Sequence, residues 1–376
     1  MNNKKRNIVF LTGTRADFGK IKALIQSLEK HTEFEPFIFV TGMHLMDEYG
    51  YTLIEVERCG FQHVETFHNH TDEATMDLTL AKTINGFSAY VKSINPDLIV
   101  VHGDRVEALA GAIVGSLNNI LVAHIEGGEL SGTIDELIRH SVSKLSHLHY
   151  TSNDEAKKRL IQMGELEATI YTIGSPDVDI MFSDKLPDLA EVKEYYEIPY
   201  ESFALVMYHP VTTELDSIYE NATKLVESLI QSGKNYVVIY PNNDLGSKRI
   251  LKAFQKLNTN SRFKIFPSIR FEYFLTLLKN SEFIIGNSSA GVREAPYYGI
   301  PTINIGNRQM NRVIGSEIIN ISCEKKDISE AIKTAETLTL DKSKTFGNGN
   351  SAALFIESLE SSTIWNVNHQ KQFKDA

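Results

Sequence analysis

The chain has 376 residues, 42% of them hydrophobic and 23% charged, which is typical of a globular protein with about two domains. No apolar run approaches the roughly 20 residues that a membrane-spanning helix needs. The net charge of −10 argues against a nucleic-acid partner, because duplex binding depends on a strongly basic surface. Cys59 and Cys323 are the only cysteines, which excludes a disulfide framework and a cysteine-based zinc site.

The first apolar run, Ile8–Leu11, follows a short basic segment. It is too short for the hydrophobic region of a signal peptide, and polar residues follow it at once. We therefore expect it to be the first strand of a cytoplasmic protein.

In the first half of the chain, short apolar runs alternate with amphipathic stretches of helical length. The predicted strands are Ile8–Leu11, Pro36–Val40, Leu98–Val101, Leu121–Ile125, His147–Tyr150 and Thr169–Ile173. The predicted helices are Gly19–His31, Glu107–Leu117, Ile134–Ser146 and Glu155–Met163.

The second half continues the same alternation. Its predicted strands are Phe203–Tyr208, Tyr236–Tyr240, Phe263–Phe266, Phe283–Ile285, Thr302–Ile305 and Glu317–Ile321. Its predicted helices are Ser217–Ser232, Ser247–Lys256, Phe271–Lys279, Ala290–Tyr298 and Ile328–Leu338. About twelve apolar strands separated by helices favour two parallel sheets of six, each covered on both faces.

The pattern predicts an α/β chain with two Rossmann-like domains facing across a cleft. The first domain is expected at 1–183 and the second at 201–350, with a seam of low strand signal between them. Residues 351–376 are expected to form a helix that crosses back over the first domain. In open parallel sheets, ligands bind beyond the carboxyl ends of the strands, so the loops that follow strands are the candidate site.

Three such loops in the first half carry charged residues. Residues 12–20 (TGTRADFGK) open a helix, where free N–H groups favour an anion, although the loop is neither a P-loop nor a GxGxxG motif. Asp104 follows the strand Leu98–Val101, where it is either a cleft carboxylate or a helix N-cap. Glu126 closes another strand, and a carboxylate there needs a partner or a polar cleft.

The third loop leads into a helix whose first turn is also acidic. Thr133 and Glu136 match a capping box, which leaves Asp135 to face the cleft. Asp104, Glu126 and Asp135 are thus a candidate acid/base set, because crowded carboxylates acquire different pKa values.

In the second half, His209 ends a strand and is either a donor to phosphate, an acid/base group or a structural residue. Residues 286–289 (GNSS) then bring N–H groups and hydroxyls to a helix start, which suits a pyrophosphate. Glu294 lies one to two turns further on and is suited to a ribose diol. Two pairs of alternating histidines, 68/70 and 147/149, have no third ligand at metal-site spacing, so we interpret them as loop and strand residues.

The motifs TGTRADFGK, VTGMHLMDEYG, HGDRVEALAG, HIEGGELSGTIDELIRHSVSKLSH, HPVTTE, YPNND, IGNSSAGVREAPYYGIPTINIGNRQ and TIWNV occur in this order. Together they resemble the hydrolysing UDP-N-acetylglucosamine 2-epimerases of the bacterial sialic acid and capsule pathways. They are also similar to the epimerase domain of the bifunctional animal enzyme. The resemblance spans roughly Asn7 to Phe373.

The resemblance implies the GT-B fold and conversion of UDP-N-acetylglucosamine and water to N-acetylmannosamine and UDP. It implies no metal and no cofactor, and a homodimer or a dimer of dimers. It gives catalytic roles to Asp104, Glu126, Asp135 and His209. It places in the substrate site Arg15, Asp17, His44, Arg105, Asn243, Arg270, Phe274, Ser288, Ser289, Glu294 and Arg308.

Three alternatives remain at this point. A non-hydrolysing epimerase would release UDP-N-acetylmannosamine, and a related hydrolysing enzyme would act on UDP-di-N-acetylbacillosamine. A GT-B glycosyltransferase would share the nucleotide loop but would need an acceptor site.

Overall fold

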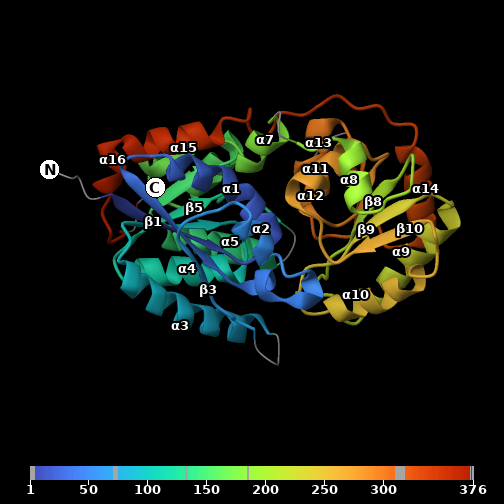
Figure 1. Cartoon of the computed structure of the whole chain (residues 1–376), viewed down its shortest axis with the longest axis horizontal. Helices are drawn as coiled ribbons and strands as arrows, with labels where there is room; N and C mark the ends of the chain where they lie inside the picture. The colour runs from blue at the N-terminus through green and yellow to red at the C-terminus, as the bar shows by residue number, and fades with distance from the viewer. Residues whose placement is uncertain are drawn as a thin grey trace. The chain divides into compact units, whose positions relative to one another are not determined.

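The computed structural model describes residues 5–70, 75–131, 134–183, 186–309, 318–372 and 374. The chain divides into two units, shown in Figure 1. The first contains Met1–Glu129, Asp135–Ser183 and Thr345–Ala376; the second contains Leu130–Ile134 and Asp184–Lys344. The second unit is therefore inserted into the sequence of the first.

The first unit is built on a parallel sheet of seven strands in the order β3-β2-β1-β4-β5-β6-β7. Its strands are β1 (Arg6–Thr12), β2 (Phe34–Val40), β3 (Val64–Thr66), β4 (Leu98–His102), β5 (Leu121–Ile125), β6 (Leu148–Thr151) and β7 (Ile170–Thr172). Its helices up to the seam are α1 (Arg15–Glu29), α2 (Leu53–Glu57), α3 (Met76–Ile94), α4 (Val106–Leu117), α5 (Ile134–Leu145), α6 (Asp154–Gln162) and α7 (Pro176–Met181). Short 3-10 turns are η1 (Gly42–Leu45), η2 (Asp47–Tyr49) and η3 (Glu167–Thr169).

All six strands predicted for this half are present, but the expected count of six is wrong because the edge strand β3 adds a seventh. Val64–Thr66 has only three residues, and Glu65 and Thr66 are exposed, so it carries no apolar run. Helix α3 was not predicted either. Only Thr83, Phe87 and Val91 are buried on it, which leaves most of its surface polar or partly exposed.

The second unit has a parallel sheet of six strands in the order β10-β9-β8-β11-β12-β13, as expected. Its strands are β8 (Ala204–Met207), β9 (Tyr236–Ile239), β10 (Phe263–Phe266), β11 (Ile284–Gly286), β12 (Thr302–Ile305) and β13 (Ile318–Ile321). Its helices are α8 (Leu189–Tyr195), α9 (Ile218–Ser232), α10 (Ser247–Phe254), α11 (Phe271–Lys279), α12 (Ser289–Arg293), α13 (Ala295–Tyr298) and α14 (Lys325–Ala335), with a 3-10 turn η4 (Gln255–Leu257). Position 317, the predicted first residue of the last strand, lies outside the described residues.

The predicted helix Ala290–Tyr298 is broken into α12 and α13 at Glu294. Pro296 occupies the first turn of α13. Proline has no N–H to donate and its ring clashes with a preceding helical carbonyl, so a single helix through this position is disfavoured.

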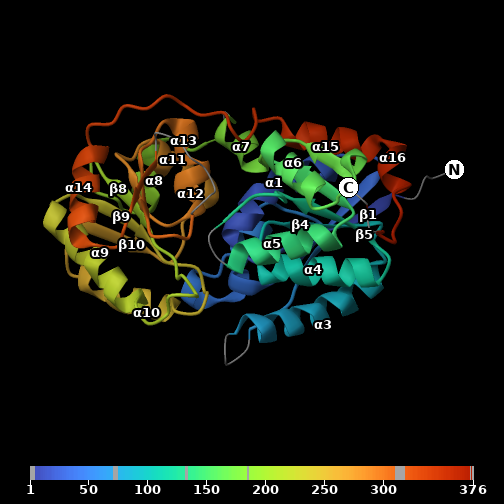
Figure 2. The same ribbon diagram turned by 180° about the vertical axis from the view of Figure 1, so that it is seen from behind.

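The C-terminal segment forms α15 (Ser351–Glu360) and α16 (Ser362–Trp365) and belongs to the first unit. Phe355 is fully buried, with its ring 4.9 Å from that of Tyr150 and 6.5 Å from that of Phe10. Asp179 on α7 accepts hydrogen bonds from the backbone N–H groups of Ser351 and Ala352, both at 2.8 Å. Figure 2 shows α15 alongside α1, on the sheet face opposite α3 and α4.

Each unit has its own apolar core. In the first, apolar side chains of β1, β2, β4, β5 and β6 pack against those of α1 and α15. In the second, those of β8, β9, β11 and β12 pack against those of α9, α10 and α14. Among the described residues, we find no helix long and apolar enough to cross a membrane.

Candidate active-site residues

The carboxyl ends of β4 and β5 lie side by side, since His102 pairs with Ile125 in the parallel register. The N–H of Gly103 donates to the carbonyl of Ile125 at 3.0 Å, which continues the pairing one residue past β4. Asp104 and Glu126 therefore leave the sheet at the same edge, on neighbouring strands. The structure places two of the three predicted carboxylates as the strand-end argument required.

Asp104 forms an ion pair with Arg139, which lies on α5 and is 3% exposed. The Asp104 side chain keeps 22% of its surface exposed. The ion pair therefore sets a buried positive charge against a partly exposed carboxylate. Arg139 also connects α5 to the loop after β4, and we did not predict this contact from the sequence.

His124 makes a second connection between α5 and this loop. Its Nδ1 lies 3.0 Å from the Ser143 hydroxyl and its Nε2 lies 2.8 Å from the carbonyl oxygen of Gly103. A carbonyl can only accept, so Nε2 carries the proton and Nδ1 accepts from Ser143. Burial lowers the pKa of His124 to about 3, which keeps the ring neutral.

Glu126 lies at the centre of a buried polar cluster. Its Oε2 is 3.0 Å from Nε2 of His102, and its Oε1 accepts a hydrogen bond from Ser175 and lies 3.8 Å from Nζ of Lys20. Lys20 in turn contacts Asp177 at 2.7 Å. Glu126 adopts a left-handed backbone conformation with φ of 64°, which costs a non-glycine residue about 1 kcal/mol or more.

Lys20, Ser175 and Asp177 were not among the predicted site residues. Lys20 is the last residue of the TGTRADFGK loop, and Ser175 and Asp177 follow the strand β7. The strand-end rule applied to β7 would have singled out this loop. The contact with Lys20 is long-range and has no local signature.

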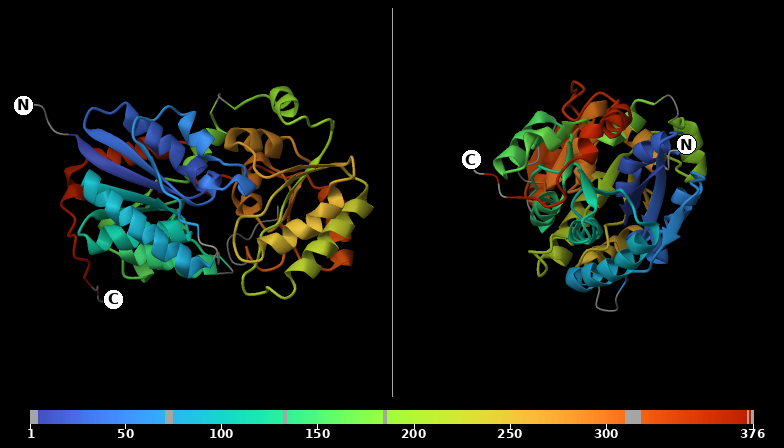
Figure 3. Two further views of the ribbon diagram at one scale, coloured as in Figure 1. Left: turned by 60° about the horizontal axis from the view of Figure 1, so that its bottom comes forward. Right: turned by 90° about the vertical axis from the view of Figure 1, so that its left-hand side faces the viewer.

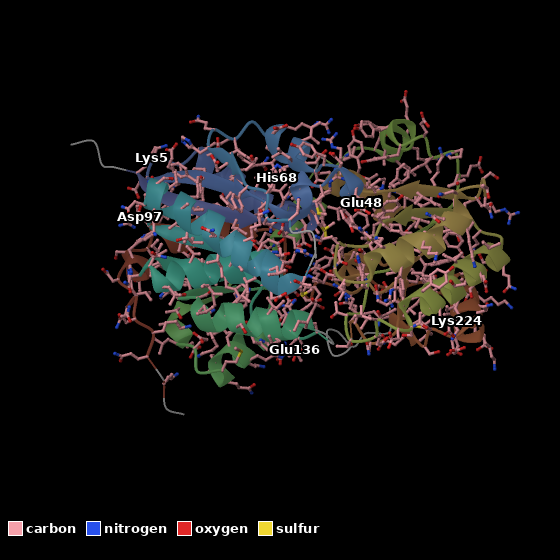
Figure 4. The ribbon with its side chains drawn as sticks, turned by 90° about the horizontal axis from the view of Figure 1, so that it is seen from below. Lys5, Glu48, His68, Asp97, Glu136 and Lys224 are labelled. Carbon is pink, nitrogen blue, oxygen red and sulfur yellow. The ribbon has the colours of Figure 1, made fainter. Side chains whose placement is uncertain are left out.

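Asp135 lies in the first turn of α5, one helical turn before Arg139. Glu136 next to it pairs with His140 at 3.8 Å, and Figure 4 labels Glu136 on this helix. The predicted capping box cannot be described, because Thr133 lies outside the described residues.

The loop after β1 does not offer its N–H groups to an external anion as expected. Asp17 accepts from the N–H groups of Gly13 at 3.0 Å and Thr14 at 3.1 Å and from the hydroxyl of Thr12 at 2.5 Å. Thr14 closes a capping box with Asp17, so this carboxylate fills the position predicted for a ligand. The N–H groups of Gly13 and Thr14 are therefore paired with a side chain of their own helix, whereas an anion at residues 12–20 as a whole stays a prediction.

Two predicted arginines pair with acidic side chains. Arg15 lies 3.7 Å from Glu55, and Nε of Arg105 donates to Glu107 at 3.1 Å. Glu107 is only 1% exposed and was not predicted. Its side chain packs against Gly13 and Gly42, where an added Cβ would collide with it.

His44 is fully buried between two hydroxyls, with Nε2 3.1 Å from Thr12 and Nδ1 2.8 Å from Thr52. Burial lowers the pKa of His44 to about 4. In the first unit this ring packs behind the loop after β1, and its place in a substrate site stays a prediction.

His44 and His124 predict a loss of stability in mild acid. Below pH 6.5 the unfolded chain protonates both rings, while the folded chain resists until about pH 4 for His44 and about pH 3 for His124. The contribution of the two neutral rings to the free energy of unfolding is thus complete above pH 6.5. As the pH falls below this value, the free energy of unfolding decreases by about 1.4 kcal/mol per pH unit for each ring. Urea unfolding followed by the fluorescence of Trp365, the only tryptophan, measures this for the first unit. His44→Gln should reduce the slope, and a free energy of unfolding that stays constant between pH 6.5 and 5 would contradict the prediction.

In the second unit, the side chain of Asn287 holds the backbone of His209. Its Oδ1 accepts from the His209 N–H at 2.6 Å, and its Nδ2 donates to the His209 carbonyl at 2.9 Å. The N–H of Asn242 donates to Nδ1 of His209 at 3.0 Å, so the neutral ring carries its proton on Nε2. His209 is thereby oriented as a hydrogen-bond donor.

The loop after β11 has the expected helix start. Gly286 has φ of 141°, and a Cβ there would collide with the backbone of Met207 on β8, so only glycine fits. Ser288 is the N-cap of α12 and accepts from the N–H of Ala290, while Glu294 is 4% exposed. Arg308 donates to the Asn287 carbonyl at 3.3 Å, which adds it to the same loop.

The remaining predicted residues lie elsewhere in the second unit. The Arg270 guanidinium lies over the ring of Tyr273 at 4.6 Å, and the Arg270 N–H donates to the Tyr196 hydroxyl at 2.9 Å. Phe274 is buried on α11, and Asn243 is partly exposed after β9.

We predicted that both histidines of the second pair are strand residues, and this holds for His149 but not for His147, because β6 begins at Leu148. His149 is fully buried in β6, and His68 is exposed in the loop after β3, where Figure 4 labels it. In the part of the chain that the structure describes, no group of three or more His, Cys, Asp or Glu side chains is arranged to hold a metal ion.

Two parallel-sheet units with helices between their strands define the class of α/β proteins with two Rossmann-like domains. The family model described as UDP-N-acetylglucosamine 2-epimerase matches residues 26–360. The chain belongs to this family.

Three relatives support the assignment. The chain is 49% identical to the "UDP-N-acetylglucosamine 2-epimerase" of Neisseria meningitidis serogroup B, over 98% of the chain and 99% of the relative. It is 33% identical to the "Polysialic acid biosynthesis protein P7" of Escherichia coli, over 88% and 86% of the two chains. It is 32% identical to the "UDP-N,N'-diacetylbacillosamine 2-epimerase (hydrolyzing)" of Legionella pneumophila, over 94% and 96%.

The fold also matches solved structures. The UDP-GlcNAc 2-epimerase of Methanocaldococcus jannaschii, solved in complex with UDP-GlcNAc and UDP, aligns with a TM-score of 0.80. The alignment covers 94% of this chain and 99% of that one, at 23% identity. The two Rossmann-like, GT-B-like domains expected from the sequence are confirmed.

Proposed function

We propose that the chain hydrolyses UDP-N-acetylglucosamine with inversion at C2, releasing N-acetylmannosamine and UDP, as the first step of sialic acid biosynthesis. The 49% identity to the meningococcal enzyme supports the nucleotide sugar. The names of the Legionella and Escherichia coli relatives support hydrolysis and the sialic acid context.

The observation that carries the chemical proposal is the pair of strand-end carboxylates in unlike surroundings. Asp104 faces a guanidinium, whereas Glu126 shares hydrogen bonds with His102 and Ser175 and lies near Lys20. Two neighbouring carboxylates with different charged and hydrogen-bonded partners suit the different acid and base roles that proton transfer at a sugar ring needs.

The proposed reaction has two stages. UDP leaves C1 while the proton at C2 is removed from the opposite face, which gives 2-acetamidoglucal. Water then adds syn, so that its hydroxyl reaches C1 and a proton reaches C2 on the same face. This face is opposite to the one from which the C2 proton was removed, which gives N-acetylmannosamine. Carboxylates stabilise the positive charge at C1 and move both protons, with Asp104, Glu126 and Asp135 in these roles.

The second unit supplies the groups proposed to hold the nucleotide. His209 offers its Nε2–H to the departing phosphate, and Ser288 and Ser289 offer hydroxyl and N–H groups to the diphosphate. Glu294 is proposed to bind the ribose diol. Arg15, Arg105 and Arg308 are the proposed cations for the phosphates or the sugar.

Incubation with UDP-N-acetylglucosamine in D2O, followed by NMR, tests the proposal. Free N-acetylmannosamine carrying deuterium at C2 is the expected product, because the first stage removes the C2 proton and the second stage adds one derived from the solvent. UDP-N-acetylmannosamine as the product would indicate a non-hydrolysing epimerase, and no turnover without an added acceptor would indicate a glycosyltransferase.

The Legionella relative favours a second candidate substrate, UDP-N,N'-diacetylbacillosamine. The same experiment with both nucleotides in competition compares them through their kcat/KM values. A preference for the diacetylated sugar would replace N-acetylglucosamine in the proposal while leaving the elimination and hydration unchanged.

A further inference from the structure

The segment that follows α16 lies against the first unit, and Figure 3 shows it running on from α16 along that unit. The carbonyl of His369 lies 3.0 Å from Nε2 of His147. The Nδ1 of His369 lies 2.5 Å from the carbonyl of Asn119. The Gln370 side chain donates to the side chain of Asn119. These contacts bring the next residue, Lys371, to the end of helix α5.

Lys371 caps the C-terminal end of α5. Its ammonium donates to the carbonyl of Ser143 at 3.3 Å and to that of Ser146 at 2.6 Å. Carbonyls in the last turn of a helix lack the usual partner four residues on, and that of Ser143 accepts instead from the N–H of Ser146 at 3.1 Å. A second lone pair stays available to Lys371, and a cation there also interacts favourably with the helix dipole. The same ammonium contacts Glu165, whose side chain is only 2% exposed, at 2.5 Å.

Helix α5 connects this end to the candidate acid/base residues. Ser143, whose carbonyl Lys371 binds, uses its hydroxyl to hold His124, and His124 holds the Gly103 carbonyl next to Asp104. One turn earlier on the same helix, Arg139 pairs with Asp104 directly. A shift of α5 along its axis would therefore move both supports of Asp104 together.

We propose that Lys371 is a positioning residue: by fixing the end of α5 it holds Arg139 and His124 where they orient Asp104. Its effect on turnover rests on the proposed function, whereas its effect on α5 does not. The competing explanation is that Lys371 only balances the charge of the buried Glu165.

Lys144 offers a matched control for that explanation. Lys144 lies in the last turn of α5 and contacts the same carboxylate at 2.7 Å, but its other hydrogen bond goes to the carbonyl of Met163 and not to a carbonyl at the end of α5. Lys371→Met and Lys144→Met each remove one cation from Glu165. Only Lys371→Met removes the cap on α5.

The experiment compares Lys371→Met, Lys371→Arg and Lys144→Met in the full chain. For Lys371→Met we expect faster amide hydrogen exchange in α5 and in residues 102–107, and a kcat about 10- to 100-fold lower with the Kd for UDP unchanged. Lys371→Arg should retain much of the slow hydrogen exchange and of the kcat of wild type, because a guanidinium can still donate to the carbonyls. Lys144→Met should leave the exchange of residues 102–107 and kcat within about twofold of wild type, as expected of a partly exposed ion pair.

Unchanged exchange in Lys371→Met would overturn the proposal. Equal losses of kcat in Lys371→Met and Lys144→Met would also overturn it, in favour of charge balance at Glu165. If the wild-type protein does not turn over UDP-N-acetylglucosamine, the proposed function fails, and the exchange measurement still decides the role of Lys371.

Discussion

Asp104→Asn is expected to lower kcat for UDP-N-acetylglucosamine by about three orders of magnitude while leaving the Kd for UDP within about twofold of wild type. The substitution preserves the size of the side chain and its ability to accept a hydrogen bond from Arg139, but it removes the charge. A loss of this size corresponds to about 4 kcal/mol of transition-state stabilisation. Steady-state kinetics and calorimetric titration with UDP measure the two quantities.

Glu126→Gln should behave in the same way, since the amide keeps the contacts with His102 and Ser175 but cannot carry the proton. The matched control is Glu136→Gln, which neutralises a carboxylate on α5 that pairs with His140. This control should retain kcat within about twofold, as expected of a partly exposed ion pair. Wild-type kcat in Asp104→Asn or Glu126→Gln would refute the assignment of that carboxylate.

Lys20→Met is expected to destabilise the first unit by about 3–5 kcal/mol, because it breaks a buried ion pair and leaves a carboxylate in the interior. The side chains of Lys20 and Asp177 are 9% and 2% exposed, and their charged atoms lie 2.7 Å apart. Methionine fills a similar volume, so little of the loss should come from a cavity. Urea unfolding monitored by Trp365 fluorescence reports the change in this unit.

The double variant Lys20→Met/Asp177→Leu separates charge from packing. It removes both members of the pair, and replacing a buried pair with apolar side chains is often neutral or stabilising, so most of the loss should be recovered. Recovery should not be complete, because Glu126 also lies 3.8 Å from the lysine. If Lys20→Met unfolds at the same urea concentration as wild type, the pair does not stabilise the fold.

The periodic apolar runs predicted both sheets because buried parallel strands are apolar on both faces. They could not predict β3, a three-residue edge strand with two exposed polar residues, since such a strand carries no apolar run and its position depends on pairing with β2. Pro296 indicates a break between α12 and α13, but we predicted one continuous helix because the apolar pattern runs through this position.

The candidate site was predictable where chemistry follows strand ends and unpredictable where partners come from distant parts of the chain. Asp104 and Glu126 were located by their strands. Their partners Arg139 and Lys20 come from α5 and α1, and Asp177 on α7 contacts that lysine. Asp17 shows the opposite case: a polar residue at a strand end whose carboxylate caps its own helix. Local sequence does not distinguish a carboxylate that binds its own backbone from one available to a ligand.

The order of the units along the chain has a consequence for synthesis on the ribosome. The sheet of the first unit is complete at β7, but Phe355, which packs against Phe10 and Tyr150, is translated only after the whole second unit. The part of the first unit's core that α15 covers therefore stays uncovered while the second unit is synthesised. A stop codon shortly before Ser351 would therefore remove part of the core of the first domain. The truncated domain would expose apolar side chains and become prone to aggregation and proteolysis.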